Sequence, residues 1–104
     1  MKVIQIVPRT KTRLYSALVK KEAEIARRGL GTFVRSGHRV RNSAKWRHKR
    51  FKGWVKLGRG LSEIVTAEVH TQSADQDWQL LSAFLGFVDR HFGDKVLVIT
   101  IHPR

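Results

Sequence analysis

The sequence predicts an α+β fold in which two helices pack on one face of a mostly antiparallel sheet of four to five strands. Three observations support this prediction: β-branched runs near both ends of the chain, two segments with apolar residues at helical spacing, and two alternating segments separated by glycines. The chain has 104 residues, of which 41% are hydrophobic, so it has the size and the apolar content of one domain. We expect residues 1–104 to form a single domain.

The first strand and the first helix are expected before residue 29. Residues 1–7 place apolar side chains on both faces of an extended chain, which is typical of a buried interior strand. Thr10 is a candidate N-cap for a helix that runs to about Arg28, because apolar residues recur at helical spacing in between. Gly29 then suits a left-handed position at the end of this helix.

The middle of the chain contains candidate strands. Residues 32–41 have strand composition, whereas residues 42–50 lack a clear period and are predicted to form a loop. Residues 51–57 and 61–71 alternate between apolar and polar side chains, which indicates two strands. In the first, one face is expected to carry Phe51, Val55 and Leu57, and the other Lys52, Trp54 and Lys56. In the second, one face is expected to carry Leu61, Val65, Ala67 and Val69. Gly58-Arg59-Gly60 between them is typical of a hairpin connection.

A capping box predicts the start of the second helix. Ser73 is followed three residues later by Gln76, a spacing at which the two side chains can satisfy free backbone amides. The apolar face expected to enter the core consists of Trp78, Leu81, Phe84, Leu85, Val88 and Phe92. Residues 95–101 form a nearly unbroken apolar strand, which we expect to be covered on both faces or to lie centrally in the sheet.

The order of these elements favours a split-βαβ, ferredoxin-like arrangement, with residues 32–50 in excess of that pattern. The interior order of helix, three strands and helix also resembles a double-stranded-RNA-binding domain with an extra strand at each end. That resemblance implies phosphate binding by basic side chains at the start of the last helix. The corresponding turn of this chain carries Asp75 and Asp77, which would repel phosphate.

Basic residues are concentrated in the first part of the chain. Residues 1–60 contain 18 Lys and Arg and two acidic residues, whereas residues 61–104 contain three basic and six acidic residues. The densest segment, residues 35–59, has ten basic residues and no acidic one. A field of one sign opposes a compact fold through self-repulsion, so such a segment indicates an anionic partner.

We therefore predict a non-catalytic nucleic-acid-binding protein. Cations neutralise phosphates and aromatic side chains stack on bases. RNA is favoured slightly over DNA because aromatic residues lie among the cations and no helix–turn–helix pattern is present. Trp46 and Trp54 are the candidates for base stacking, with packing against the body of the fold as the alternative. The predicted binding residues are Arg35, Arg39, Arg41, Lys45, Trp46, Arg47, His48, Lys49, Arg50, Lys52, Trp54, Lys56 and Arg59.

Three other functions fit the same residues. A metal-independent ribonuclease could use His38 or His48 as acid or base beside a cation. The basic, tryptophan-containing segment could bind an anionic membrane surface. A small interaction protein could form a homodimer through a sheet edge.

No cofactor or metal site is predicted. The chain has no cysteine, and Glu68 with His70 supplies only two ligands on one strand face. No run approaches the roughly 20 apolar residues of a membrane span. With no signal-peptide pattern either, the expected location is the cytoplasm.

Overall fold

The computed structural model describes residues 1–38 and 40–103. This part of the chain forms six strands, two α-helices and two short 3-10 helices. In chain order the elements are β1 (Lys2–Pro8), α1 (Leu14–Arg27), β2 (Phe33–Arg35), β3 (Ser43–His48), β4 (Trp54–Arg59), a 3-10 helix (Leu61–Glu63), β5 (Val65–His70), α2 (Ala74–Phe92), a second 3-10 helix (Gly93–Lys95) and β6 (Val96–Pro103).

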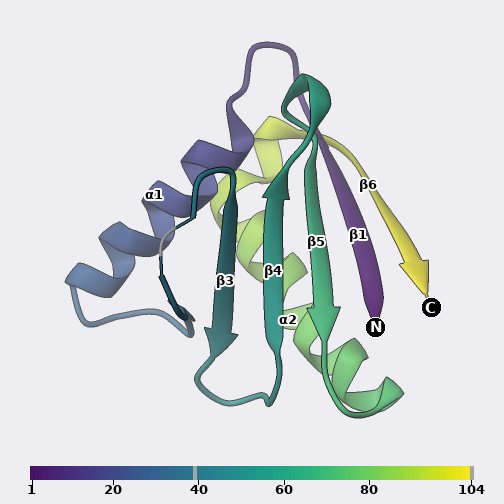
Figure 1. The fold of residues 1–104 in the computed structure, drawn as a ribbon. Coiled ribbons are helices and arrows are strands. Elements are labelled where there is room, and N and C mark those ends of the chain that lie inside the picture. The colour runs from purple at the N-terminus through teal and green to yellow at the C-terminus, as the bar shows by residue number, and fades with distance from the viewer. Residues whose placement is uncertain (39, 104) are drawn as a thin grey trace.

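The strands form one antiparallel sheet in the order β2-β3-β4-β5-β1-β6. Both helices lie on the same side of this sheet, behind it in Figure 1. The opposite face, which we call the open face, is not covered by a helix in the described part of the chain (Figure 1). The predicted α+β class is confirmed, but the sheet has six strands rather than four to five.

The additional strand lies where the sequence predicts a loop. β3 occupies residues 43–48, and the strand predicted over residues 32–41 is reduced to the three residues of β2. The alternation in β3 is present but weak, because Ala44 and His48 are the only companions of Trp46 on its inward side. Along the chain, four strands therefore lie between the two helices, one more than in a double-stranded-RNA-binding domain.

The hairpin between β4 and β5 and the start of α1 differ from the prediction. Gly58 and Arg59 belong to β4, and the connection runs through the 3-10 helix, where Leu61 is 90% exposed. α1 begins at Leu14 rather than after Thr10, because residues 10 and 11 form a turn. Gly29 has the predicted left-handed backbone, with φ of 68°.

The core lies between the sheet and the helices. Strands β1, β4 and β5 contribute alternate aliphatic side chains, and the alternation predicted for β5 is confirmed because Val65, Ala67 and Val69 are all fully buried. At the β2–β3 end the core is aromatic: the rings of Phe33, Trp46, Phe84 and Phe87 contact one another with centroids 5.3 to 6.2 Å apart. Burial of this cluster fastens the edge of the sheet to α2.

Two apolar predictions near the other edge are wrong. Trp78 is 45% exposed, and Leu80 and Phe87 are buried on the part of α2 that enters the core. Among the described residues β6 pairs with β1 alone and is an edge strand, so it is neither central nor covered on both faces. Neither helix of the described residues has the length and apolar character needed to cross a membrane.

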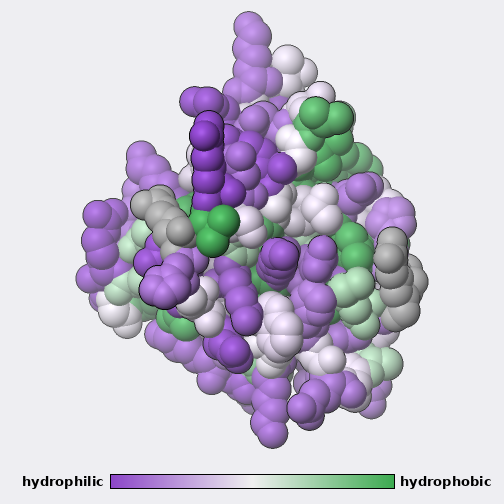
Figure 2. All heavy atoms as spheres, in the orientation of Figure 1, coloured by the Kyte–Doolittle hydropathy of each residue, from purple (hydrophilic) through white to green (hydrophobic). Residues whose placement is uncertain are grey.

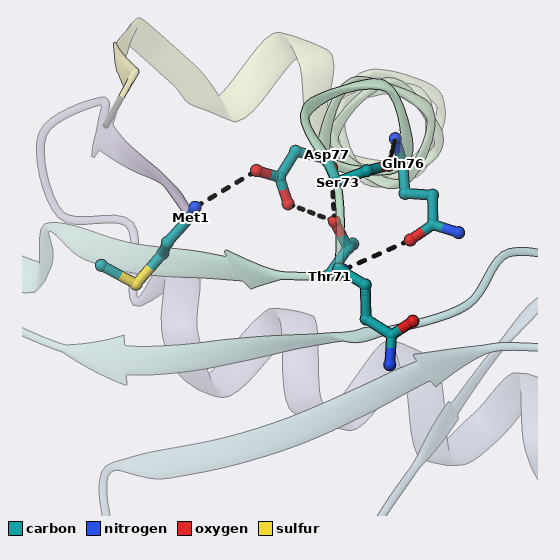
Figure 3. Close-up of polar contacts among 6 residues, drawn as sticks. Met1, Thr71, Ser73, Gln76 and Asp77 are labelled. Atoms are coloured by element: carbon teal, nitrogen blue, oxygen red, sulfur yellow. Dashed lines mark hydrogen bonds and ion pairs between the residues drawn. The ribbon is translucent and has the colours of Figure 1, made fainter.

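The predicted cap of α2 is confirmed (Figure 3). The Ser73 hydroxyl accepts a hydrogen bond from the Gln76 amide at 3.2 Å, and the Gln76 side chain accepts one from the Gln72 amide. Asp77 is buried in this first turn, where it accepts a hydrogen bond from the Thr71 hydroxyl and lies 3.2 Å from the ammonium of Met1. Burial acts to raise the pKa of the Asp77 carboxyl, but these partners and Lys2 outweigh it and lower the pKa below its usual value.

Candidate nucleic-acid interface

Strands β3 and β4 place a group of cations on the open face. In the antiparallel register Lys45 lies opposite Lys56, and Lys56 lies opposite Glu68 of β5. Like charges directly opposite each other are unfavourable in a sheet, and Glu68 offsets only part of the repulsion between Lys45 and Lys56 because it lies opposite Lys56 alone. Hydrophilic side chains cover most of this face over β3, β4 and β5 (Figure 2).

Trp54 lies at the centre of these cations. Its indole stacks on the His70 ring, with centroids 5.2 Å apart and an angle of 14° between the planes. The Lys45 ammonium lies 4.4 Å from the centroid of the indole, and the Arg47 guanidinium lies 5.9 Å from it. The indole is half-buried, so part of its surface faces solvent among positive charges.

A hollow lies on each side of Trp54. One, of about 580 Å³, is lined on the sheet by Lys45, Lys56, Glu68 and His70, and on its rim by residues of the segment between β2 and β3. The other, of about 440 Å³, is lined by Arg47, Lys52, Gly53, Thr71, Gln72 and Gln76. Trp54 lines both hollows, so a ligand in either one adjoins the indole.

Gly53 allows the β3–β4 loop to approach the end of β5 closely. Its φ is 103°, a conformation that side chains other than glycine rarely adopt. A Cβ atom at this position would lie 2.3 Å from the carbonyl oxygen of His70. The close approach brings Lys52 beside the start of α2, which completes the second hollow.

Two polar residues of the open face form their own pair. The His70 Nε2 lies 2.9 Å from the Glu68 Oε1, as expected for neighbours on one face of β5. The described residues contain no group of three or more side chains placed to hold a metal ion. Glu68 and His70 therefore orient each other, and the His70 ring packs against one face of the Trp54 indole.

His48 lies at the end of β3, away from Trp54. Its Nδ1 accepts hydrogen bonds from the backbone amides of Arg50 and Phe51 at 3.0 and 3.2 Å. Burial, together with the charge of Arg50, lowers the pKa of this imidazole below its usual value. The ring is held as a neutral acceptor that shapes the β3–β4 loop, in which Lys49, Arg50 and Lys52 are exposed.

Several predicted binding residues lie elsewhere. Trp46 is fully buried, so its interpretation as an exposed stacking residue is wrong: its position in β3 points it into the core. Arg35 lies beside Glu22 of α1: its backbone hydrogen-bonds to the Glu22 carboxyl, and its positive charge acts on the same group. Arg59 is directed to the helix side, where its guanidinium donates to the Ser16 hydroxyl and lies 3.5 Å from Glu63.

A third hollow extends the basic surface around the β2–β3 turn. It has a volume of about 450 Å³ and is lined by Arg35, Arg41 and Arg59 together with polar residues of α1 and the turn. It shares Val40 with the larger open-face hollow, so the two meet at this turn. Arg39, also predicted to bind, lies outside the described residues.

The binding residues predicted from the sequence do not include His70 or the side-chain amides of Gln72 and Gln76, which line the two hollows beside Trp54. Gln76 is explained in the sequence as part of a helix cap, Gln72 belongs to no predicted motif, and no local pattern places either beside a tryptophan 18 or more residues earlier. Neither a protein family, nor a curated protein, nor a solved structure matches the chain.

Proposed function

We propose that the protein binds single-stranded nucleic acid without cleaving it, with RNA favoured over DNA, and that the open face of β3 and β4 is the binding surface. One observation carries the proposal: Trp54 lies half-buried between two hollows lined by Lys45, Lys56, Arg47 and Lys52. An indole among cations matches the two features of a single strand, a flat base and a charged phosphate.

Each group has a defined task in this proposal. In this proposal the Lys45 side chain moves off the indole, and one base stacks on the face of Trp54 opposite His70. The Gln72 and Gln76 side-chain amides offer hydrogen bonds to base edges in the adjoining hollow. Lys45, Arg47 and Lys56 neutralise the phosphates on either side of that base. A phosphate between Lys45 and Lys56 would also remove the repulsion between these opposing ammonium groups.

The test is a salt titration of binding to a labelled single-stranded RNA of about 12 nucleotides. Replacing Lys45, Arg47 and Lys56 by Ala should weaken binding to all sequences and make the slope of log affinity against log salt shallower by about 0.7 for each lost contact. A DNA strand of the same sequence, measured by the same fluorescence anisotropy, gives the preference between RNA and DNA.

The matched control removes three exposed cations from the helix side. Lys20, Arg27 and Arg28 lie on or just after α1, so their replacement by Ala lowers the net charge equally without touching the open face. We expect the control to keep the wild-type slope. Equal slopes for the two triple variants would contradict the proposed surface, and loss of intact RNA in the presence of a chelator would contradict the absence of cleavage.

We also propose that part of the sheet is a split-βαβ, ferredoxin-like unit. The four strands in the order β6-β1-β5-β4, together with α1 and α2, follow that connectivity. β2 and β3 then form an addition beside β4. This addition supplies Lys45 and Arg47 and thereby widens the proposed binding surface.

A further inference from the structure

The two edges of the sheet differ in length and in charge. β2 has three residues and ends at the exposed Arg35, and a short charged edge discourages pairing with another strand. β6 has eight residues, Val96–Pro103, with no Lys, Arg, Asp or Glu among them. Its backbone pairs with β1 on one side only in the described part of the chain. At about 3.3 Å per residue, β6 offers an unprotected edge about 26 Å long.

Apolar side chains lie exposed along the same edge. Leu97 is 62% exposed and Val98 is 49% exposed. At the other end of β6, Trp78 of α2 is exposed beside Lys2, which is paired with the last residue of the strand. A long, uncharged edge flanked by exposed apolar groups is the type of surface that pairs with another strand.

The charge distribution favours a second copy of this chain as the partner. The basic segment lies on β2, β3 and β4, and β5 and β1 separate it from β6. Residues 61–104, which include α2 and β6, carry three basic and six acidic residues. Two copies that meet at β6 therefore keep their strongly basic surfaces at opposite ends, where mutual repulsion is smallest.

We propose that β6 pairs with β6 of a second copy, antiparallel and about a two-fold axis. Such an axis makes the contact self-complementary. If the axis is perpendicular to the sheet, residues of the same parity face each other, so Ile99 and Thr100 lie near the centre of the contact. The result is a continuous twelve-stranded sheet with all helices on one face and both copies of Trp54 on the other.

The test is the mass of the protein in solution, without nucleic acid, at about 0.3 M salt so that long-range repulsion is screened. Sedimentation equilibrium over about 1 to 100 µM protein should give twice the 12.0 kDa of one chain at the upper end. Thr100→Lys should raise the dimer dissociation constant at least about tenfold, because each dimer then brings two ammonium groups together at the contact.

Gln5→Lys is the matched control. Gln5 lies directly opposite Thr100 on the interior strand β1 and is exposed on the same face. Its replacement by Lys therefore adds the same charge one strand away from the contact. We expect this variant to dimerise like the wild type. A monomeric wild type over the whole range would overturn the proposal and leave β6 to a strand of another protein. Unchanged dimerisation of Thr100→Lys would also overturn it.

Backbone amide hydrogen exchange of the wild type provides a second readout that does not depend on a variant. The outer amides of β6 should exchange more slowly as protein concentration rises, while those of β2 should not change. Exchange in β6 that is independent of concentration would contradict pairing at this edge. Because no nucleic acid is present, failure here leaves the proposed binding by the open face untouched.

Discussion

The two faces of the β3–β4 pair have opposite roles, although they are built from alternate residues of the same two strands. On the helix side Trp46, Val55 and Leu57 are fully buried. On the open side Trp54 lies among Lys45, Arg47 and Lys56. Trp54 lies eight positions after Trp46 in the sequence, and both have cations as neighbours there.

The comparison teaches that the parity of a residue in a strand decides its role more strongly than the composition around it. Trp46 lies between Lys45 and Arg47 in the sequence, but successive side chains of a strand point to opposite faces of the sheet. The indole therefore points to the helices and the two cations point away from them. A one-residue shift in register would exchange these roles. The aromatic contacts of Trp46 with Phe84 and Phe87 oppose such a shift.

The largest effect is expected for Trp46→Ala. Removal of a fully buried indole leaves a cavity among Phe33, Phe84 and Phe87, and should lower the free energy of unfolding by about 3 to 5 kcal/mol. Urea unfolding followed by circular dichroism measures the change. Trp78→Ala is the control, because Trp78 is partly exposed and should cost much less; a larger loss for Trp78→Ala would mean that the core is wrongly assigned.

The next effect is expected for Trp54→Ala, and it should appear in binding. Loss of one base-stacking platform should weaken single-stranded RNA binding by about 1 to 3 kcal/mol. Stability should change by only about 1 kcal/mol, because the half-buried indole contacts mainly His70 and Lys45. Fluorescence anisotropy and urea unfolding on the same samples separate the two quantities. A variant that binds normally but unfolds easily would assign Trp54 to packing.

The smallest effect is expected for Asp77→Asn, which weakens the support behind Gln72 and Gln76. The variant should lose about 1 to 2 kcal/mol of stability near neutral pH, because Thr71 and the cations lose a charged partner. The folded pKa of Asp77 is lowered, so its contribution is present above the unfolded pKa and is lost as the pH falls through the folded pKa. Urea midpoints between neutral and acidic pH should therefore fall less in the variant than in the wild type. Parallel curves would show that Asp77 titrates alike in both states.

Much of the fold follows from local patterns. The alternation of Val65, Ala67 and Val69 predicts which side of β5 is buried, and Ser73 with Gln76 predicts where α2 begins. These predictions succeed because side-chain parity and helix capping depend on residues within a few positions of one another.

β3 and the buried face of α2 do not follow from local patterns. In β3, alanine and histidine flank Trp46 on the inward side, so the apolar period is too faint to indicate a strand. In α2, apolar residues extend around more than one face, and the position of the sheet decides that Leu80 and Phe87 are buried while Trp78 is exposed.

The sequence by itself determined the α+β class, the concentration of positive charge in residues 35–59, and the direction of Trp54 and Lys56 away from Val55 and Leu57. Only the tertiary structure decided that β6 is an edge, that Trp46 is core, and that Gln72 and Gln76 adjoin Trp54. The physical reason is that charge and alternation are properties of neighbouring residues. Strand order and burial depend on which distant segments the chain brings together.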